Sequence, residues 1–164
     1  MASGADSETS SRNRTRPGWI AAALIAIVAA DQLTKSWVVS HLKTGPQHIF
    51  GSAVELELAR NSGSAFSRFQ GYTPILAVLA CGVAILIARA VRHATDRWTV
   101  VGLTLVLGGA LGNLGDRFFR SPGVLRGHVV DFVKVGPWPL FNVADSCITI
   151  GAIILIARTL FKPE

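Results

Sequence analysis

The stretch YTPILAVLACGVAILIA (residues 72–88) determines the class of fold, because it carries no charged side chain over its whole length. An α-helix needs about 20 predominantly apolar residues to cross the hydrocarbon core of a bilayer. Three other stretches are similar in length and character, at residues 19–39, 98–115 and 143–161. The sequence therefore predicts an all-α integral membrane protein with four transmembrane helices.

The composition of the whole chain agrees with a membrane protein. Half of the residues are apolar, the mean hydropathy is +0.44, and 16% of the residues are charged, against about a quarter in average soluble domains. The net charge of +6 raises the question of a nucleic-acid partner. The basic residues, however, are neither gathered on one element nor interleaved with aromatic side chains, so the sequence predicts no nucleic-acid partner.

The first apolar stretch has two interpretations. Its uninterrupted part, residues 19–30, follows several arginines and ends in small residues, which is also typical of a cleaved signal peptide. The apolar character resumes after Asp31, however, and Asp31 and Lys35 are spaced so that on a helix they share a face and can pair. We therefore predict a retained transmembrane helix.

The polar ends of the chain predict its domain organisation. Residues 1–18 are small, polar and rich in Ser and Arg, so we expect a disordered cytoplasmic tail. Residues 19–161 are predicted to form one four-helix membrane domain. Residues 162–164 are predicted to be a short cytoplasmic C-terminus.

The distribution of Lys and Arg predicts the orientation of the helices. These residues are enriched in short cytoplasmic loops of membrane proteins. Here they occur in the N-terminal tail, in the short link at residues 89–98 and at the C-terminus, which lie on one side if all four helices span. The longer loops, at about residues 40–71 and 116–142, also contain basic residues but at lower density, and are predicted to be extracytoplasmic.

Both long loops contain a strand pattern. VELELA (residues 54–59) alternates apolar and acidic side chains, and HVVDFVKV (residues 128–135) is rich in β-branched residues. We expect the two segments to pair into a small extracytoplasmic β-sheet on the outer membrane surface.

Four of the ten acidic residues fall on the same predicted side of the membrane: Asp31, Asp116, Asp131 and Asp145. Each also has a simple structural interpretation. Asp145 can stabilise a helix N-terminus that Asn142 caps, Asp116 can pair with Arg117, and Asp131 can be solvated. Their shared location favours a chemical role over four separate structural ones.

Two neighbouring carboxylates can perform hydrolysis without a metal or a nucleophilic side chain. When they lie close together they cannot both ionise easily, so one keeps a proton. The ionised acid then removes a proton from water, while the protonated acid polarises the scissile carbonyl. The chain contains neither HExxH nor GxSxG, and its four histidines lack metal-ligand spacing.

Five motifs carry a resemblance to a known family. GNLGDR (residues 112–117), HVVDF (128–132) and FNVAD (141–145) follow one another in this order, after DQLTK (31–35) and ARNSGSAFS (59–67). In this arrangement they resemble the bacterial lipoprotein signal peptidase family, also called signal peptidase II. The resemblance covers residues 19–161.

The resemblance implies an aspartyl peptidase of the bacterial plasma membrane with four helices, cytoplasmic termini and an extracytoplasmic active site. Such enzymes remove signal peptides from prolipoproteins by cleaving before a cysteine that carries a diacylglyceryl group. The implied partners are therefore diacylglyceryl prolipoproteins and membrane lipids, with no metal or cofactor. We expect the protein to act as a monomer.

The resemblance also implies residue roles. Asp131 and Asp145 match the catalytic dyad. The matching positions that we expect to support the dyad or bind substrate are Asp31, Lys35, Asn61, Gly63, Asn113, Asp116, Arg117 and Asn142. Ala65 matches the same first-loop motif as Asn61 and Gly63. The stretch FFRSPGVLRG (residues 118–127) is longer than in many members and can reshape the substrate entrance or contact anionic lipid head groups.

Two other classes of function suit a small helical membrane protein. A transporter would place ionisable residues near the bilayer midplane and often contains an internal repeat. A non-catalytic scaffold would leave the shared location of the acids unexplained. The placement of three of the four acids at one interface favours the peptidase.

Overall fold

The computed structural model of the chain describes residues 16–42, 45–50, 53–63 and 73–161. It contains the helices α2 (Arg16–His41), α3 (Thr73–His93), α4 (Arg97–Phe119) and α5 (Val143–Phe161), and the strands β1 (Gln47–Phe50), β2 (Val54–Asn61) and β3 (Val129–Val135). All four helices are long and apolar enough to cross a membrane. The predicted helices are confirmed, and three of them extend beyond the predicted bounds.

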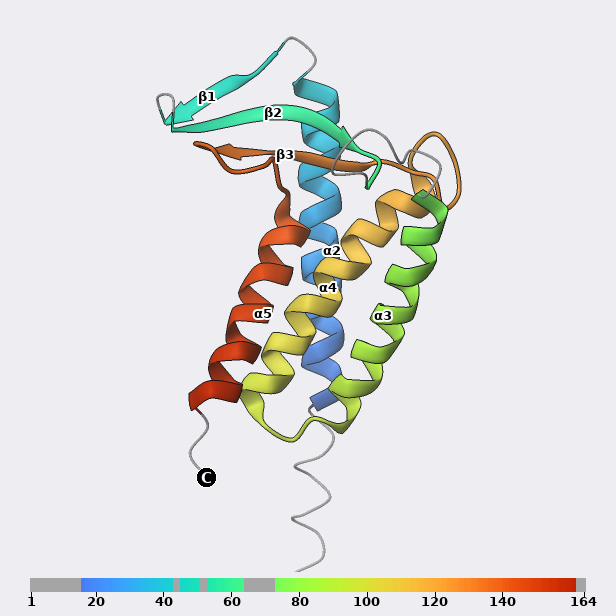
Figure 1. Ribbon diagram of the computed structural model, residues 1–164, viewed down its shortest axis with the longest axis vertical. Helices are drawn as coiled ribbons and strands as arrows, with labels where there is room; N and C mark the ends of the chain where they lie inside the picture. The colour runs from blue at the N-terminus through green and yellow to red at the C-terminus, as the bar shows by residue number, and fades with distance from the viewer. Residues whose placement is uncertain (1–15, 43–44, 51–52, 64–72, 162–164) are drawn as a thin grey trace, which may run out of the picture.

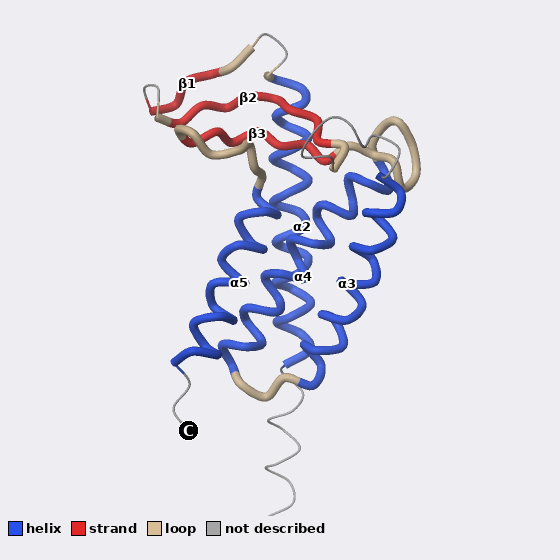
Figure 2. Tube along the Cα trace, in the orientation of Figure 1, coloured by secondary structure: helices blue, strands red, loops and turns tan. Residues whose placement is uncertain are grey.

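The four helices run side by side, and the β-sheet lies across one end of the bundle (Figures 1 and 2). The first turn of α2 and the last turn of α5 lie at the opposite end (Figure 1). Residues 16–18, which were predicted to belong to the tail, form the start of α2. The rest of the predicted tail and residues 162–164 lie outside the described residues.

The outer surface of the bundle is apolar. Large side chains such as Ile85 and Leu86 on α3 and Ile153 on α5 are more than half exposed. Three of the four tryptophans lie near helix ends, where Trp and Tyr are enriched in membrane proteins: Trp19 and Trp98 at one end of the bundle and Trp37 at the other, while Trp138 lies in the turn that follows β3. The chain is a multi-pass membrane protein.

Helix α4 is the centre of the bundle, because it contacts each of the other three helices. Its closest approach is to α5, where a Cβ atom at Gly109 would clash with the backbone carbonyl of Ala144. At the end opposite the sheet, Asp96 caps α4 by accepting a hydrogen bond from Thr99 N at 2.8 Å. Arg158 of α5 binds the same carboxylate through two contacts of 2.7 and 3.0 Å, which ties these two helices together.

The sheet is antiparallel with the order β1-β2-β3. The predicted pairing of the two outer loops is confirmed, whereas β1 was not predicted. Between Leu56 and Ala59, β2 carries one more residue than the matching part of β3, which is a β-bulge. The sheet rests on the end of α2, where Val38 and Leu42 pack against Val130 and Phe132.

Candidate active site

A buried cluster of charges lies beneath the sheet. Lys35 Nζ is 2.8 Å from Asp31 Oδ2 and 2.8 Å from Asp116 Oδ2, and all three side chains are fully buried. Arg120 forms a further ion pair with Asp116. Gln32 Nε2 donates to both carboxylates, at 3.2 and 3.1 Å. Burial of charges is costly unless they are paired and hydrogen-bonded, and this cluster meets both conditions.

The two acids of this cluster also bind the backbone of other elements. Asp31 Oδ1 accepts a hydrogen bond from Ala144 N at 3.0 Å, and Asp116 Oδ2 accepts one from Val130 N at 3.1 Å. Ala144 directly precedes Asp145, and Val130 directly precedes Asp131. The cluster therefore fixes the start of α5 and the strand β3 at the two residues adjacent to the predicted dyad.

Asn142 connects the two acids of the predicted dyad. Its Oδ1 accepts from Asp145 N at 2.9 Å, while its backbone N donates to Asp145 Oδ2 at 3.2 Å, which is the reciprocal pattern of a capping box. Its side-chain Nδ2 donates to Asp131 Oδ1 at 2.7 Å. The structural interpretation of Asn142 as the cap of α5 is confirmed, and the same residue holds Asp131 beside the helix start.

Asn113 connects Asp145 to the buried cluster. Its Oδ1 accepts a hydrogen bond from Lys35 Nζ at 2.9 Å, and its Nδ2 donates to Asp145 Oδ1 at 2.8 Å. An ammonium group can only donate, so Lys35 fixes which way the amide is turned. Lys35 thereby presents the NH₂ group of Asn113 to the carboxylate of Asp145.

Asp131 is only 4% exposed, so the interpretation of Asp131 as a solvated residue was wrong. Its Oδ2 accepts from Asn61 Nδ2 at 3.1 Å. Burial raises the pKa of Asp131 above its ordinary value, the nearby charge of Asp145 acts in the same direction, and the hydrogen bond from Asn61 opposes both. Asp131 therefore holds a proton more readily than a carboxyl group in water.

The β-bulge brings Asn61 to Asp131. Strict alternation along VELELA would place Asn61 on the face of Glu55 and Glu57, whose side chains lie near Lys134. The extra residue between Leu56 and Ala59 shifts the alternation, and Ala59 pairs with Asp131 in the observed register. Asn61 therefore lies on the face of the sheet that carries Asp131.

Gly63 lies close to the end of the Arg117 side chain. It has a φ of +89°, and an added Cβ would lie 2.8 Å from Arg117 Nη2. The N–H of Gly63 donates to Asn61 Oδ1 at 2.7 Å, which turns the Asn61 amide toward Asp131. Arg117 Nη1 approaches the carbonyl of Ser62 at 3.5 Å. The proposed pair between Asp116 and Arg117 was wrong, because the carboxylate of Asp116 binds Lys35 and Arg120 instead.

Several of the side chains described above line one cavity of about 340 Å³. Its polar part contains both acids of the predicted dyad together with Asn61, Asn113 and Arg117. Its apolar part is formed by α3, α4 and α5 through Leu76, Ala80, Ala110, Leu114 and Ile148. The cavity therefore combines a polar part, which holds the two acids, with an apolar wall that belongs to three of the four long apolar helices.

The sequence analysis assigned no role to Gln32 and did not predict the contact of Arg120 with Asp116. Gln32 lies inside the quoted motif DQLTK, beside Asp31. Arg120 lies four residues after Asp116, and this spacing on a helix was a usable signal for their pairing. Ala65 lies outside the described residues.

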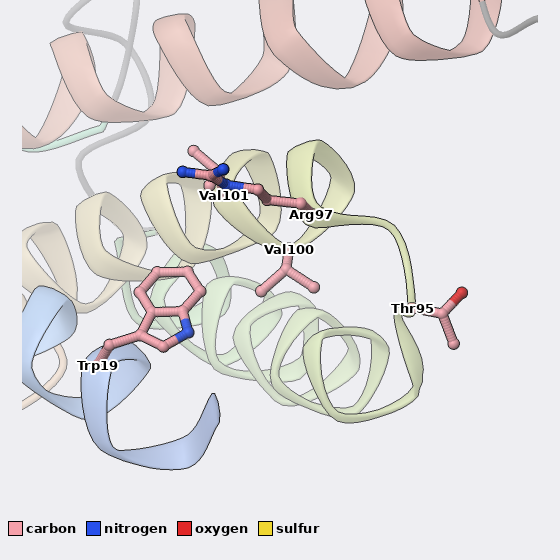
Figure 3. Close-up of a pocket in the computed structure, with 5 residues that line it drawn as sticks. All are labelled: Trp19, Thr95, Arg97, Val100 and Val101. Carbon is pink, nitrogen blue, oxygen red and sulfur yellow. The ribbon is translucent and has the colours of Figure 1, made fainter. Parts of the chain in front are cut away.

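A second cavity, of about 430 Å³, lies at the other end of the bundle between the starts of α2 and α4. It is lined by Trp19, Thr95, Arg97, Val100 and Val101 (Figure 3). No acidic side chain is among these lining residues. The cavity beneath the sheet is therefore the candidate for acid–base chemistry.

Comparison with known proteins gives one consistent family. The family described as Signal peptidase (SPase) II matches residues 23–161. The lipoprotein signal peptidase of Rhodococcus jostii is 53% identical over 84% of this chain and 70% of its own length. That of Mycolicibacterium smegmatis is 47% identical over 95% of this chain and 67% of its own length. A bacterial membrane enzyme solved by the in meso method at 1.9 Å resolution matches 89% of this chain and 95% of its own, with 27% identity and a TM-score of 0.78.

Proposed function

The chain belongs to the signal peptidase II family and removes signal peptides from prolipoproteins, and we propose that Asp131 and Asp145 are its catalytic dyad. The observation that carries this proposal is the difference in partners among the four acids. Asp31 and Asp116 are bound to cations, whereas amide groups hold the carboxylates of Asp131 and Asp145 toward one cavity. An acid without a bound cation can exchange its proton during a reaction.

The two acids divide the chemistry between them. We assign the role of the base to Asp145, because Asn113 and the backbone N–H of Asn142 donate to its two carboxylate oxygens at the N-terminus of α5. Asp131 carries the proton, because burial raises its pKa. Asp145 removes a proton from the attacking water, and Asp131 gives its proton to the oxygen of the scissile carbonyl. The product of this step is a neutral gem-diol at the former carbonyl carbon.

The second step breaks the C–N bond. Asp145, now protonated, gives its proton to the departing amide nitrogen, and Asp131 takes one proton from a hydroxyl group of the gem-diol. The carbonyl re-forms as a carboxylic acid, and the new amine leaves on the lipid-bearing cysteine. Both acids return to their starting protonation states, so no covalent enzyme intermediate is required.

The shape of the cavity supports a lipid-modified substrate. The scissile bond needs the polar part, where both acids and a water can reach it, whereas a diacylglyceryl chain needs an apolar surface. Leu76, Ala80 and Ile148 offer such a surface within the transmembrane helices. We therefore propose that diacylglyceryl prolipoproteins enter from the bilayer between α3 and the rest of the bundle, and that bilayer lipids fill the same wall when substrate is absent.

Arg117 and the loop that contains Gly63 support binding rather than chemistry. The Arg117 side chain lines the cavity and lies beside the backbone of Ser62 and Gly63. It can donate to a substrate carbonyl next to the scissile bond while leaving both acids free.

The proposed topology places the termini in the cytoplasm and the active site at the extracytoplasmic face of the bacterial plasma membrane. It is supported by the basic side chains Arg89, Arg92 and Arg97 in and beside the short α3–α4 link, at the end opposite the sheet. A monomer is supported by the site itself, since one chain supplies both acids and the residues that position them. The peptidase domain is proposed to span residues 19–161.

A gel-shift cleavage assay with two forms of one precursor tests this function. The diacylglyceryl-modified precursor is expected to be cleaved before its lipidated cysteine, and the unmodified precursor is expected to remain intact. Equal cleavage of both forms would reject the lipid specificity. No cleavage of either form by folded protein would reject the peptidase and favour the transporter alternative.

A further inference from the structure

A third cavity lies at the sheet end of the bundle and holds basic side chains. Its volume is about 250 Å³, and it lies between the ends of α2 and α4 and the sheet. Its lining residues are Val39, Arg60, Phe119, Arg120, Ser121, His128 and Val130. We call it the basic cavity. Three of its seven lining residues can carry a positive charge, and none is acidic.

The basic cavity lies on the other side of β3 from the candidate active site. Side chains alternate between the two faces of a strand. Val129 and Asp131 line the cavity of the dyad, whereas Val130 lines the basic cavity. Arg60 pairs with Val130 across the sheet, so the two side chains lie on the same face. The basic cavity is therefore a separate site that shares one strand with the active site.

The charges of the basic cavity are only partly compensated. Arg120 pairs with Asp116 at the inner edge of the cavity. Within the described part of the chain, no acidic side chain forms an ion pair with Arg60 or His128. Guanidinium and imidazole groups around a small cavity are well suited to the oxygens of a phosphate group.

Backbone hydrogen bonds fold the segment that contains Ser121 and His128 back against the end of α4. His128 N donates to the carbonyl of Ser121 at 3.1 Å, and Gly127 N donates to the carbonyl of Arg117 at 3.1 Å. Residues 118–127, a stretch longer than in many members of the resembled family, begin with the end of α4, and the part after Phe119 returns to this helix and closes this side of the basic cavity. Their conformation holds the imidazole of His128 near the end of α4.

Apolar side chains beside the basic cavity favour the phosphate group of a lipid over that of a soluble molecule. Phe119 lines it and is 90% exposed, and Val124 in the adjoining loop is 68% exposed. Phe119 is the last residue of α4 and Val124 lies in the loop that follows, so they are placed to meet acyl chains while the basic groups meet head groups. A soluble phosphate would gain nothing from these two side chains.

We infer that the basic cavity binds the phosphate of an anionic phospholipid, with Arg60 and His128 as ligands and Phe119 against the acyl chains. Its cationic lining favours a glycerol head group over one that carries an ammonium group. The inference rests on the chain spanning a membrane and is independent of the assignment of the dyad. The lipid would anchor β2 and the 118–127 loop to the outer membrane surface.

Native mass spectrometry of the delipidated full-length protein tests this inference. Phosphatidylglycerol and phosphatidylcholine with the same acyl chains are titrated against the parent and Arg60→Gln/His128→Gln. The parent is expected to bind phosphatidylglycerol more tightly, and the double variant to lose about tenfold in affinity for it. Cleavage of the lipidated precursor in detergent is expected to be unchanged, which separates this site from the dyad.

The matched control is Arg89→Gln/Arg92→Gln, which removes two exposed basic side chains at the other end of the bundle. An equal loss of affinity in this control would overturn the inference, because binding would then reflect overall charge. Equal binding of both lipids by the parent, or displacement of the lipid by glycerol phosphate, would overturn it too. If the double variant does not fold, Arg60→Gln alone is expected to weaken binding by a smaller factor, and no weakening would count against the site.

Discussion

Two pairs of acids lie under the same sheet and differ mainly in their partners. Asp31 and Asp116 are fully buried and share the ammonium group of Lys35. Asp131 and Asp145 line a cavity and receive hydrogen bonds from amide groups. A bound cation holds an acid in its charged form, whereas amide donors leave it able to change its protonation state. Both pairs lie close to the site, so location does not distinguish them. The chemistry of their partners does.

The first pair also explains how the second is positioned. Asp31 holds the N–H of Ala144, and Asp116 holds the N–H of Val130, each one residue before an acid of the second pair. The charged cluster therefore fixes the backbone of α5 and β3, while the side chains of Asp145 and Asp131 remain at the cavity. The contrast between a structural pair and a chemical pair can be tested by mutation.

The largest effect on activity is expected for Asp145→Asn. Loss of the proposed water-activating base is expected to reduce the rate of cleavage by about 10²- to 10⁴-fold. An Asn side chain keeps one acceptor oxygen, which can receive the N–H of Asn142 and preserve the cap of α5, whereas its NH₂ group cannot accept from Asn113. The measurement is cleavage of a lipidated precursor at matched amounts of folded protein. Near-parental activity would place the base elsewhere.

The largest effect on stability is expected for Lys35→Met. This change leaves two buried carboxylates without their shared cation, and removal of one partner from a buried ion pair costs about 3–5 kcal/mol. The thermal unfolding midpoint in detergent should fall, and activity should fall with it. The double variant Lys35→Met/Asp31→Asn removes one charge of each sign and should recover part of the lost stability. A parental midpoint for Lys35→Met alone would contradict a structural role of the cluster.

A smaller effect is expected on the pH dependence of cleavage. Because the proposed mechanism needs the protonated form of Asp131, activity should fall as the pH rises through its pKa, which burial raises above the ordinary carboxyl value. The hydrogen bond from Asn61 lowers this pKa, so Asn61→Ala should move the alkaline limb of the profile upward, by up to about one pH unit. An upward shift of the acidic limb, with the alkaline limb unchanged, would show instead that Asp131 acts in its ionised form.

Hydropathy predicted the helices and their order because a transmembrane span is a local property of about 20 residues. The pairing of Asp31 with Lys35 was also predictable, since both residues lie on one helix face. The contact of Lys35 with Asp116 depends on how two separate helices pack, and no local pattern contains it. The sequence therefore grouped four acids on one side of the membrane without showing how they divide into pairs.

The sheet was predicted less completely. Alternation identified β2 and β-branched residues identified β3, but β1 spans only Gln47–Phe50, too short for a clear pattern. The β-bulge that brings Asn61 to Asp131 depends on the pairing register, which alternation within one strand does not determine. For Asn142 and Asp145, helix capping and a place in the site were treated as alternatives, and the observed contacts show that capping is also what orients Asp145.

The most direct test of the contrast between the two pairs is the Asp131→Asn variant, with cleavage and thermal unfolding measured on the same sample. The folded state holds a proton on Asp131 more tightly than the unfolded chain does, so the parent loses stability as the pH rises above the ordinary carboxyl value. A neutral Asn avoids this loss, but its NH₂ group cannot accept one of the two hydrogen bonds that Asn61 and Asn142 donate to Asp131. The two effects oppose each other, so at neutral pH the variant is expected to unfold near the parental temperature while cleaving no lipidated precursor. Retained cleavage, or a loss of stability as large as that of Asp116→Asn, would contradict the assignment of Asp131 to the chemical pair.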